Sequence, residues 1–235
     1  MDLDWYYIIL VLPTILVAAA ISCWVNTLFK RYSKVMARCG MTGRDAAFCV
    51  LANAGIRNVQ VDCISGNLTD HYDPSSNKIS LSEAVYSSRS VASIAVAAHE
   101  AGHACQHATG YAFAKLRSAI VPVTNFTSQI GVILIPIGIV LCYAGMNCAW
   151  IAYLGVILYS SCFVFQLITL PVEFDASRRA MAALRTTGTL DGTELSQARK
   201  MLTAAALTYV AALATSAMTI FRFLLIIGDS DRRRR

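Results

Sequence analysis

The chain has 235 residues, of which 56% are hydrophobic and only 14% charged, and its formal net charge is +6. An average soluble domain has about 25% charged residues, and the mean hydropathy of +0.54 leaves too little polar surface for a water-soluble fold. The basic residues flank apolar runs and do not alternate with aromatic residues along one surface, as they often do in nucleic-acid-binding proteins. This argues against nucleic acid as a partner. The composition therefore predicts a membrane protein.

The first apolar run covers about residues 5–28 and is long enough to cross a bilayer core about 30 Å thick. The acidic residues MDLD precede it, whereas a cleaved signal peptide carries a positive N-terminal region, so we interpret the run as an uncleaved anchor. Four basic residues follow at once: Lys30, Arg31, Lys34 and Arg38. By the positive-inside rule, they place the N-terminus outside and the next segment in the cytoplasm.

A polar insert over residues 40–98 follows this anchor. Thr42 and Asp45 have the spacing of a capping box, which predicts a helix over DAAFCVLANAG that ends at Gly55. Three short strands are expected next, over VQVDCI, LTDHY and KISLS, with DPSSN as a turn. A helix is then expected to begin near Ser82–Glu83 and to continue through SVASIAVAAHEAGHACQHA. We expect KISLS, just before this helix, to be an edge strand that pairs with an extended peptide.

Three more apolar runs follow, over about residues 119–145, 149–170 and 203–227. The first two are separated by the uncharged turn AGMNCA and are predicted to form a transmembrane hairpin whose outer ends face the same side. The last run carries Arg222, and its full crossing would leave the terminal RRRR outside, against the positive-inside rule. It is therefore interpreted either as a fourth crossing or as a helix packed against the others.

The stretch VAAHEAGHACQH, residues 96–107, contains His99, His103 and His107 out of four histidines in the chain. On a helix, residues four apart lie on one face, so His99 and His103 can bind one Zn²⁺ through ring nitrogens at about 2.0–2.1 Å. Glu100 lies one position on and can reach a water at the metal without being a ligand. This is the H-E-x-x-H pattern, with two ligands and a general base. Ordinary, hydrogen-bonded helix histidines are the alternative interpretation.

A catalytic zinc ion needs a third protein ligand and an open position for water. His107 continues the same helix face, but it lies about 6 Å further along the axis, which argues against three ligands from one straight helix. The segment PVEFDASRRA, after the third apolar run, offers Glu173 at the membrane edge, with Pro171 as the expected helix start. There are two alternatives to Glu173 as the third ligand. One is that Asp175 is the ligand, although it points roughly 200° round the helix from Glu173. The other is that Glu173 is an exposed acid in the first turn of a helix and binds no metal.

The segment LTDHYDP contributes two further candidates. His71 and Tyr72 lie in a strand–turn region from which they could approach the zinc cleft and donate a hydrogen bond to a tetrahedral oxyanion. The alternative is that both are polar turn residues that satisfy their own backbone.

The run LTDHYDPSSNKISLSEAVYSSRSVASIAVAAHEAGHACQH, followed by LPVEFDASRRA, resembles the YugP-type neutral zinc metallopeptidases of bacterial membranes over most of the chain. More distantly, HEAGH with a later E-F-x-A is similar to the glutamate-zincin membrane proteases, such as HtpX and the CAAX prenyl proteases. The resemblance implies one Zn²⁺ per chain bound by His99, His103 and Glu173, with Glu100 as the base.

This sequence departs from the distant relatives at one position. They place an aspartate four residues after the ligand glutamate, as a partner for a histidine, and here that position is Ser177. Either the Ser177 hydroxyl or the nearby Asp175 is then expected to take this role. Loss of such a partner typically costs 10–100-fold in metal affinity or activity.

The predicted fold is a mainly α membrane protein with three to four transmembrane helices. It also has a small α+β, zincin-like cytoplasmic part, built from the HExxH helix and a short β-sheet. In chain order we expect an N-terminal transmembrane anchor, the zincin-like catalytic part, a transmembrane hairpin, a helix that carries the third zinc ligand, and a fourth apolar helix with the basic tail. These parts cover residues 1–29, 30–118, 119–170, 171–202 and 203–235.

The expected function is that of a multi-pass cell-membrane zinc endopeptidase with its catalytic side in the cytoplasm, bacterial by the resemblance. Its partners would be the lipid bilayer and a membrane-associated polypeptide substrate. The alternative is a non-catalytic, zinc-containing membrane adaptor or scaffold, whose structural zinc would need a fourth ligand from His107 or a cysteine. A transporter would need ionisable residues at mid-membrane, and the apolar runs lack them apart from Arg222.

Overall fold

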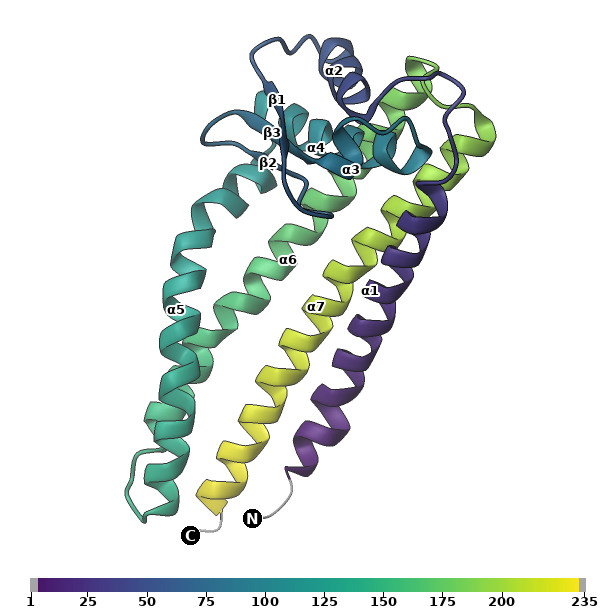
Figure 1. The fold of residues 1–235 in the computed structure, drawn as a ribbon. Helices are drawn as coiled ribbons and strands as arrows, with labels where there is room; N and C mark the ends of the chain where they lie inside the picture. Colours follow the sequence, from purple (N-terminus) through teal and green to yellow (C-terminus); the bar gives the residue numbers. More distant parts are fainter. Residues whose placement is uncertain (1–3, 233–235) are drawn as a thin grey trace. The chain divides into compact units, whose positions relative to one another are not determined.

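A computed structural model describes residues 4–232 of the chain, and in this part helices predominate beside one three-stranded sheet (Figure 1). The chain divides into two compact units. The apolar unit comprises Met1–Ala20, Leu116–Leu170 and Thr208–Arg235, and the site unit comprises Ile21–Lys115 and Pro171–Leu207. Of the basic tail, residues 233–235 lie outside the described residues.

Four helices within residues 4–232 are long and apolar enough to cross a membrane. They are α1 (Leu12–Tyr32), which a short π-helix η1 (Tyr7–Val11) precedes, α5 (Ala112–Tyr143), α6 (Ala149–Thr186) and α7 (Gly192–Arg232). Large apolar side chains such as Phe126, Val140 and Ile157 are exposed on these helices, as expected for surfaces that face lipid. The expectation of three to four such helices is confirmed, and the last apolar run lies in the fourth of them.

The third apolar run does not end where the sequence predicts. Pro171 was expected to begin a helix, but α6 continues through it from Ala149 to Thr186, so that prediction is wrong. A proline inside a helix removes one backbone hydrogen bond. Helix α6 nevertheless continues for many residues on both sides of Pro171. As a result, Glu173 lies on the same helix as the third apolar run.

The apolar unit is packed through glycines. A Cβ atom on Gly138 of α5 would lie 2.3 Å from the Ala152 nitrogen of α6, and one on Gly155 would lie 2.8 Å from the backbone nitrogen of Ile135. Small residues allow membrane helices to approach closely, because van der Waals packing drives their association. In the same unit, the Arg222 Nε donates to Asp4 Oδ2 at 2.8 Å. The arginine in the fourth apolar run is therefore paired with Asp4.

The site unit contains the sheet, formed by β1 (Gln60–Ile64), β2 (His71–Asp73) and β3 (Lys78–Ser82) in the order β1-β3-β2. β1 and β3 lie in the segments predicted for them, and β2 overlaps its segment at His71 and Tyr72 but extends to Asp73, the first residue of the predicted turn. The expectation that KISLS is an edge strand is wrong, because β3 pairs in parallel with β1 and antiparallel with β2. Ile79 and Leu81 are fully buried, which suits a central strand. The sheet edges belong to β1 and β2.

Helix α2 (Gly43–Asn53) begins and ends as its sequence predicts. The Thr42 Oγ1 accepts a hydrogen bond from the Asp45 N–H, and the Asp45 carboxylate accepts from the Thr42 N–H at 3.0 Å, which completes the capping box. At the other end Gly55 has a φ of +72°, and the Ile56 N–H donates to the Leu51 carbonyl. Glycine adopts this left-handed conformation without steric cost.

The helix that carries the histidines begins later than predicted. Instead of one helix from Ser82–Glu83 onward, the chain forms α3 (Glu83–Tyr86) and α4 (Val91–Ala108). The backbone between them bonds to an earlier segment: Arg89 accepts from Ala37, and Ser88 accepts from Gly43. Ser90 then caps α4 by accepting from the Ser93 N–H. These tertiary hydrogen bonds replace the helical ones that the sequence pattern implied.

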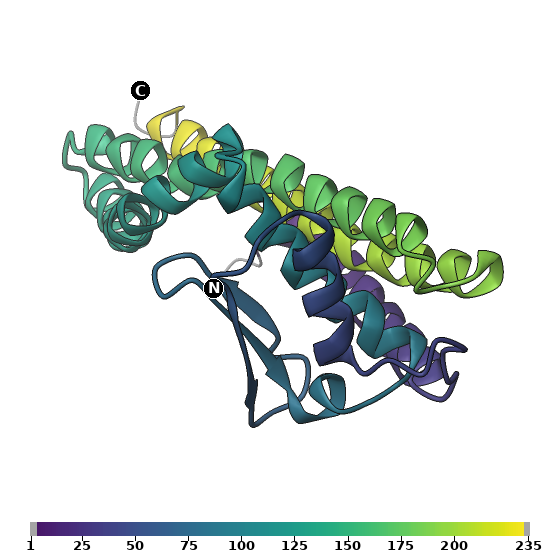
Figure 2. The ribbon, with the colours of Figure 1, turned by 90° about the horizontal axis from the view of Figure 1, so that it is seen from above.

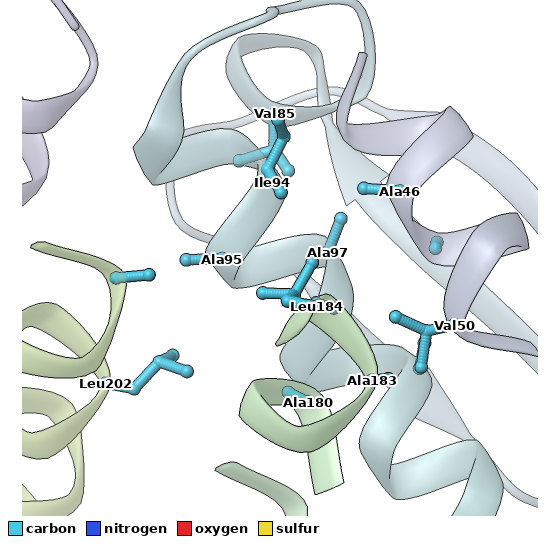
Figure 3. Packing of buried hydrophobic residues seen from close by; sticks show 14 of the residues in the cluster. Ala46, Val50, Val85, Ile94, Ala95, Ala97, Ala180, Ala183, Leu184 and Leu202 are labelled. Carbon is cyan, nitrogen blue, oxygen red and sulfur yellow. The ribbon is translucent and has the colours of Figure 1, made fainter. Parts of the chain in front are cut away.

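Helix α4 lies at the centre of the site unit (Figure 3). Its small apolar residues contact α2 on one side, where the two helices lie next to each other (Figure 2). The buried cluster also includes residues of α6 and of the N-terminal part of α7. Figure 3 labels Ile94, Ala95 and Ala97 of α4 among them, with Ala46 and Val50 of α2, Ala180, Ala183 and Leu184 of α6, and Leu202 of α7.

Candidate metal centre

The structure brings His99 and His103 of α4 together with Glu173 of α6. One ligand atom from each residue lies within 4.8 Å of the other two. The Glu173 Oε2 is 3.3 Å from the His99 Nε2 and 3.6 Å from the His103 Nε2. Glu173 is only 3% exposed, so its carboxylate faces the two imidazoles rather than water.

A glycine in the middle of the histidine motif permits this convergence. A Cβ atom on Gly102 would lie 2.5 Å from the Ala176 carbonyl oxygen of α6. Any side chain there would push the two helices apart, because a backbone carbonyl cannot rotate away. Helix α6 therefore approaches α4 at the turn that holds His99 and His103, and Glu173 lies one turn before Ala176.

Each histidine has a hydrogen-bond partner on the ring nitrogen that points away from Glu173. The His103 Nδ1 is 3.0 Å from the Gln106 Oε1, and the His99 Nδ1 is 3.1 Å from the Ser177 Oγ. An amide oxygen can only accept, so His103 carries its proton on Nδ1 and leaves Nε2 free as a metal ligand. Such partners are the usual means by which metal-binding histidines are oriented. Ser177 thus occupies the position expected of a histidine partner.

Gln106 was not among the residues that the sequence singled out. It is fully buried, and its Nε2 donates to the Val172 carbonyl oxygen at 2.7 Å and to the Asp175 Oδ2 at 3.0 Å. Asp175 in turn accepts from the Arg179 Nε at 2.6 Å and from Arg178. Asp175 therefore reaches His103 through Gln106. The available signal was the spacing of three residues between His103 and Gln106, which places both on one helix face.

The charges around the histidines favour a cation. Burial lowers the pKa of His103, but the hydrogen bond to Glu173 and the charges of Glu100 and Glu173 raise it, and the net direction is upward. Glu100 is itself only 9% exposed and is not one of the three converging residues. Two buried carboxylates beside two imidazoles stabilise positive charge at this point, whether a proton or a metal ion supplies it.

The remaining candidates lie elsewhere in the site unit. The His107 Nδ1 is 3.1 Å from the Tyr72 hydroxyl, and His107 does not join the metal-binding group. The Tyr72 hydroxyl also donates to the Asn77 Oδ1 at 2.8 Å. His71 is exposed, and its Nδ1 lies 2.8 Å from the Thr69 carbonyl oxygen. The fold thus brings Tyr72 to the helix of the histidines, whereas His71 contacts its own turn.

These residues have the donor set of a zinc site. Two imidazole nitrogens and one carboxylate oxygen are common zinc ligands, and three protein ligands with an open fourth position are typical of catalytic zinc. Within residues 4–232 no fourth histidine, cysteine, aspartate or glutamate joins the group. In both histidines the Nδ1 already has a hydrogen-bond partner, and the Nε2 faces Glu173. The arrangement therefore fits a zinc ion.

Two comparisons with known proteins identify what the chain is similar to. The model of a family described as "Putative neutral zinc metallopeptidase" matches residues 7–228. The chain is also 43% identical over 213 residues to "Putative membrane protease YugP" of Bacillus subtilis (strain 168), which covers 89% of this chain and 92% of the relative. No solved structure gave a significant match.

The third ligand can be identified by metal analysis. Glu173→Ala is expected to lose zinc, because two histidines and water hold the ion less firmly than three protein ligands do. His107→Ala is expected to keep zinc near one per chain, because its imidazole lies against Tyr72 and not in the group. Atomic absorption of the purified variants measures both. A full site in Glu173→Ala together with an empty one in His107→Ala would establish a triple-histidine site instead.

The role of Gln106 is tested by metal affinity. Gln106→Leu removes the acceptor for the His103 Nδ1 and is expected to weaken zinc binding by about 10–100-fold. Asp175→Ala, which acts one hydrogen bond further away, is expected to retain zinc near one per chain with a smaller loss of affinity. Competition against a chromophoric chelator measures both, with the melting temperature as a check on folding. Unchanged affinity in a folded Gln106→Leu protein would mean that packing alone orients His103.

Proposed function

The chain belongs to the neutral zinc metallopeptidase family, and we propose that it is a zinc-dependent endopeptidase embedded in a membrane. The observation that carries this proposal is the convergence of His99, His103 and Glu173, with the buried Glu100 beside them. The match of the family model over residues 7–228 supports the same activity. The four long apolar helices and the similarity to a membrane protease support the location.

In the proposed mechanism, His99, His103 and Glu173 hold one Zn²⁺. When bound, this ion would lower the pKa of a water molecule towards about 7 and polarise the scissile carbonyl. Glu100 acts as the general base: its carboxylate takes the proton of the attacking water and then passes it to the leaving amine. Gln106 and Ser177 keep the imidazoles in place, because each engages an Nδ1.

The proposed substrate is a membrane-associated polypeptide. Glu173 lies on the helix that also carries the third apolar run, so the site is connected directly to a segment suited to lipid. With β3 in the centre of the sheet, we assign peptide pairing to the edge strand β2 instead. Its Tyr72 hydroxyl lies against His107 at the end of α4. In the proposed reaction the Tyr72 hydroxyl would give up its hydrogen bond to Asn77 and donate one to the tetrahedral oxyanion instead.

A zinc-containing adaptor or scaffold remains the second candidate. A structural zinc site is normally closed by four protein ligands, and the three-residue group of the described chain favours catalysis over this role. An adaptor would also have no use for a buried carboxylate at position 100.

We further propose that the site faces the cytoplasm of a multi-pass membrane protein. Most of the 20 lysines and arginines lie in the segments between the first and second apolar runs and between the third and fourth. The site unit is formed largely from these same segments. Basic residues are retained on the cytoplasmic side, and this charge distribution is the support for the proposed orientation.

Replacing the proposed base separates catalysis from metal binding. Glu100→Gln is expected to lower casein hydrolysis by detergent-purified protein at least about 100-fold, while zinc stays near one per chain. Glu83→Gln, an exposed glutamate of α3, is the matched control and is expected to behave like the wild type. Wild-type activity in Glu100→Gln would exclude the mechanism, and zinc binding without hydrolysis in the wild type would favour the adaptor.

The orientation is tested by labelling single cysteines in intact cells with an impermeant maleimide. The native Cys63 is exposed in the site unit and is expected to be protected when it is the only cysteine. A cysteine introduced by Asn147→Cys, in the turn between α5 and α6, is expected to react from outside. Labelling of Cys63 from outside with protection at position 147 would place the metal centre on the outer side.

A further inference from the structure

A basic hollow of about 380 Å³ lies between the C-terminal part of α6 and the N-terminal part of α7, within the site unit. We propose that it binds an anionic phospholipid, with the phosphate at Arg185 and Arg199 and an acyl chain along the apolar wall. Its volume falls in the range of roughly 300–1,000 Å³ that is common for ligand pockets. The proposal is independent of the proteolytic activity.

The lining of the hollow combines arginines with apolar side chains and contains no acidic residue. Phe174, Met181 and Ala182 of α6 face it, as do Leu202 and Ala206 of α7. The basic residues are Arg178, Arg185 and Arg199. Such a surface is complementary to a molecule that has both an anionic group and a hydrocarbon chain.

Arg185 and Arg199 have no acidic partner within residues 4–232, whereas the nearby acids are already engaged. Asp191 pairs with the Arg38 guanidinium at 2.7 Å, and Glu194 accepts from the Arg38 N–H at 2.9 Å. Arg178 pairs with Asp175. Asp191 lines the neighbouring hollow beside Arg185 and Arg199, but its carboxylate is paired with Arg38, so neither arginine of the basic hollow has an ion pair of its own in the described chain. A guanidinium binds phosphate oxygens in a bidentate manner.

Arg185 and Arg199, the two arginines without an acidic partner, lie towards one end of the hollow, whereas Arg178 lies near Phe174 and is paired with Asp175. Arg185 and Arg199 also line a second hollow that includes Leu190, Asp191 and Gly192, at the connection between α6 and α7. Phe174 and Ala206 lie at the opposite end, where both helices lead into their apolar runs. A phospholipid has the same order, with its charge at the membrane surface and its chains towards the bilayer centre.

The lining favours a lipid over a peptide. An extended peptide needs partners for its backbone N–H and C=O groups, and here the surrounding backbone is helical and already bonded. Of the polar side chains, Ser177 contacts the His99 Nδ1, which is the nitrogen on the far side of the ring from Glu173. The hollow therefore includes the residue that contacts the His99 Nδ1, whereas the His99 Nε2 faces Glu173. An acyl chain needs no hydrogen bonds.

Native mass spectrometry of the full chain in detergent tests the proposal with dioleoyl phosphatidylglycerol and dioleoyl phosphatidylcholine. The wild type is expected to bind phosphatidylglycerol roughly tenfold more tightly, and Arg185→Gln with Arg199→Gln is expected to abolish this preference. Arg57→Gln with Arg89→Gln removes the same amount of charge from exposed positions outside the hollow. This control variant is expected to retain the preference for phosphatidylglycerol. Equal binding of both lipids by the wild type would overturn the proposal.

A second variant separates the hollow from its charge. Ala182→Trp fills the exposed rim while both arginines remain, and it is expected to lower phosphatidylglycerol binding about as much as the double arginine variant. Wild-type binding in Ala182→Trp would show that the arginines act only as general surface charge. Displacement of phosphatidylglycerol by a short polyglutamate peptide would identify a polypeptide site instead, and would equally overturn the proposal. Melting temperatures confirm that each variant is folded.

Discussion

The contact between α4 and α6 at Gly102 is the constraint on which the metal centre depends. The hydrogen atoms of this glycine are all that fits against the Ala176 carbonyl, since a Cβ atom would lie 2.5 Å from its oxygen. Only at this spacing does the Glu173 carboxylate reach both imidazoles. A buried carboxylate costs several kcal/mol unless it is paired, so positive charge between the helices is needed for their packing as much as for chemistry.

A hydrogen-bonded network behind the ligands connects the same two helices. It runs from Arg179 through Asp175 and Gln106 to His103, and a separate contact joins Ser177 to His99. Both contacts with the imidazoles are made at Nδ1, whereas the Nε2 atoms face Glu173. The network therefore holds the rings in one orientation and leaves their Nε2 atoms facing the carboxylate.

The long helices relate the proposed peptidase site to the membrane. Because α6 passes through Pro171 without interruption, the third apolar run and Glu173 belong to one helix. In the apolar unit, Arg222 is paired with Asp4. The same two helices, α6 and α7, also form the basic hollow of the site unit. A lipid bound there would stabilise the pair of helices that includes Glu173.

The sequence by itself determined the features that depend on local spacing. The separation of four residues places His99 and His103 on one face, the capping box begins α2, and the apolar runs have the length of a membrane helix. It also singled out Glu173. Tertiary structure decided whatever depends on distant partners: Gln106 bonds to groups 66 and 69 residues away. The central position of β3 likewise depends on strand pairing, and the interruption before α4 depends on backbone bonds to residues 35–43. Local patterns carry no information about such contacts, because the atoms that make them meet only after the chain has folded.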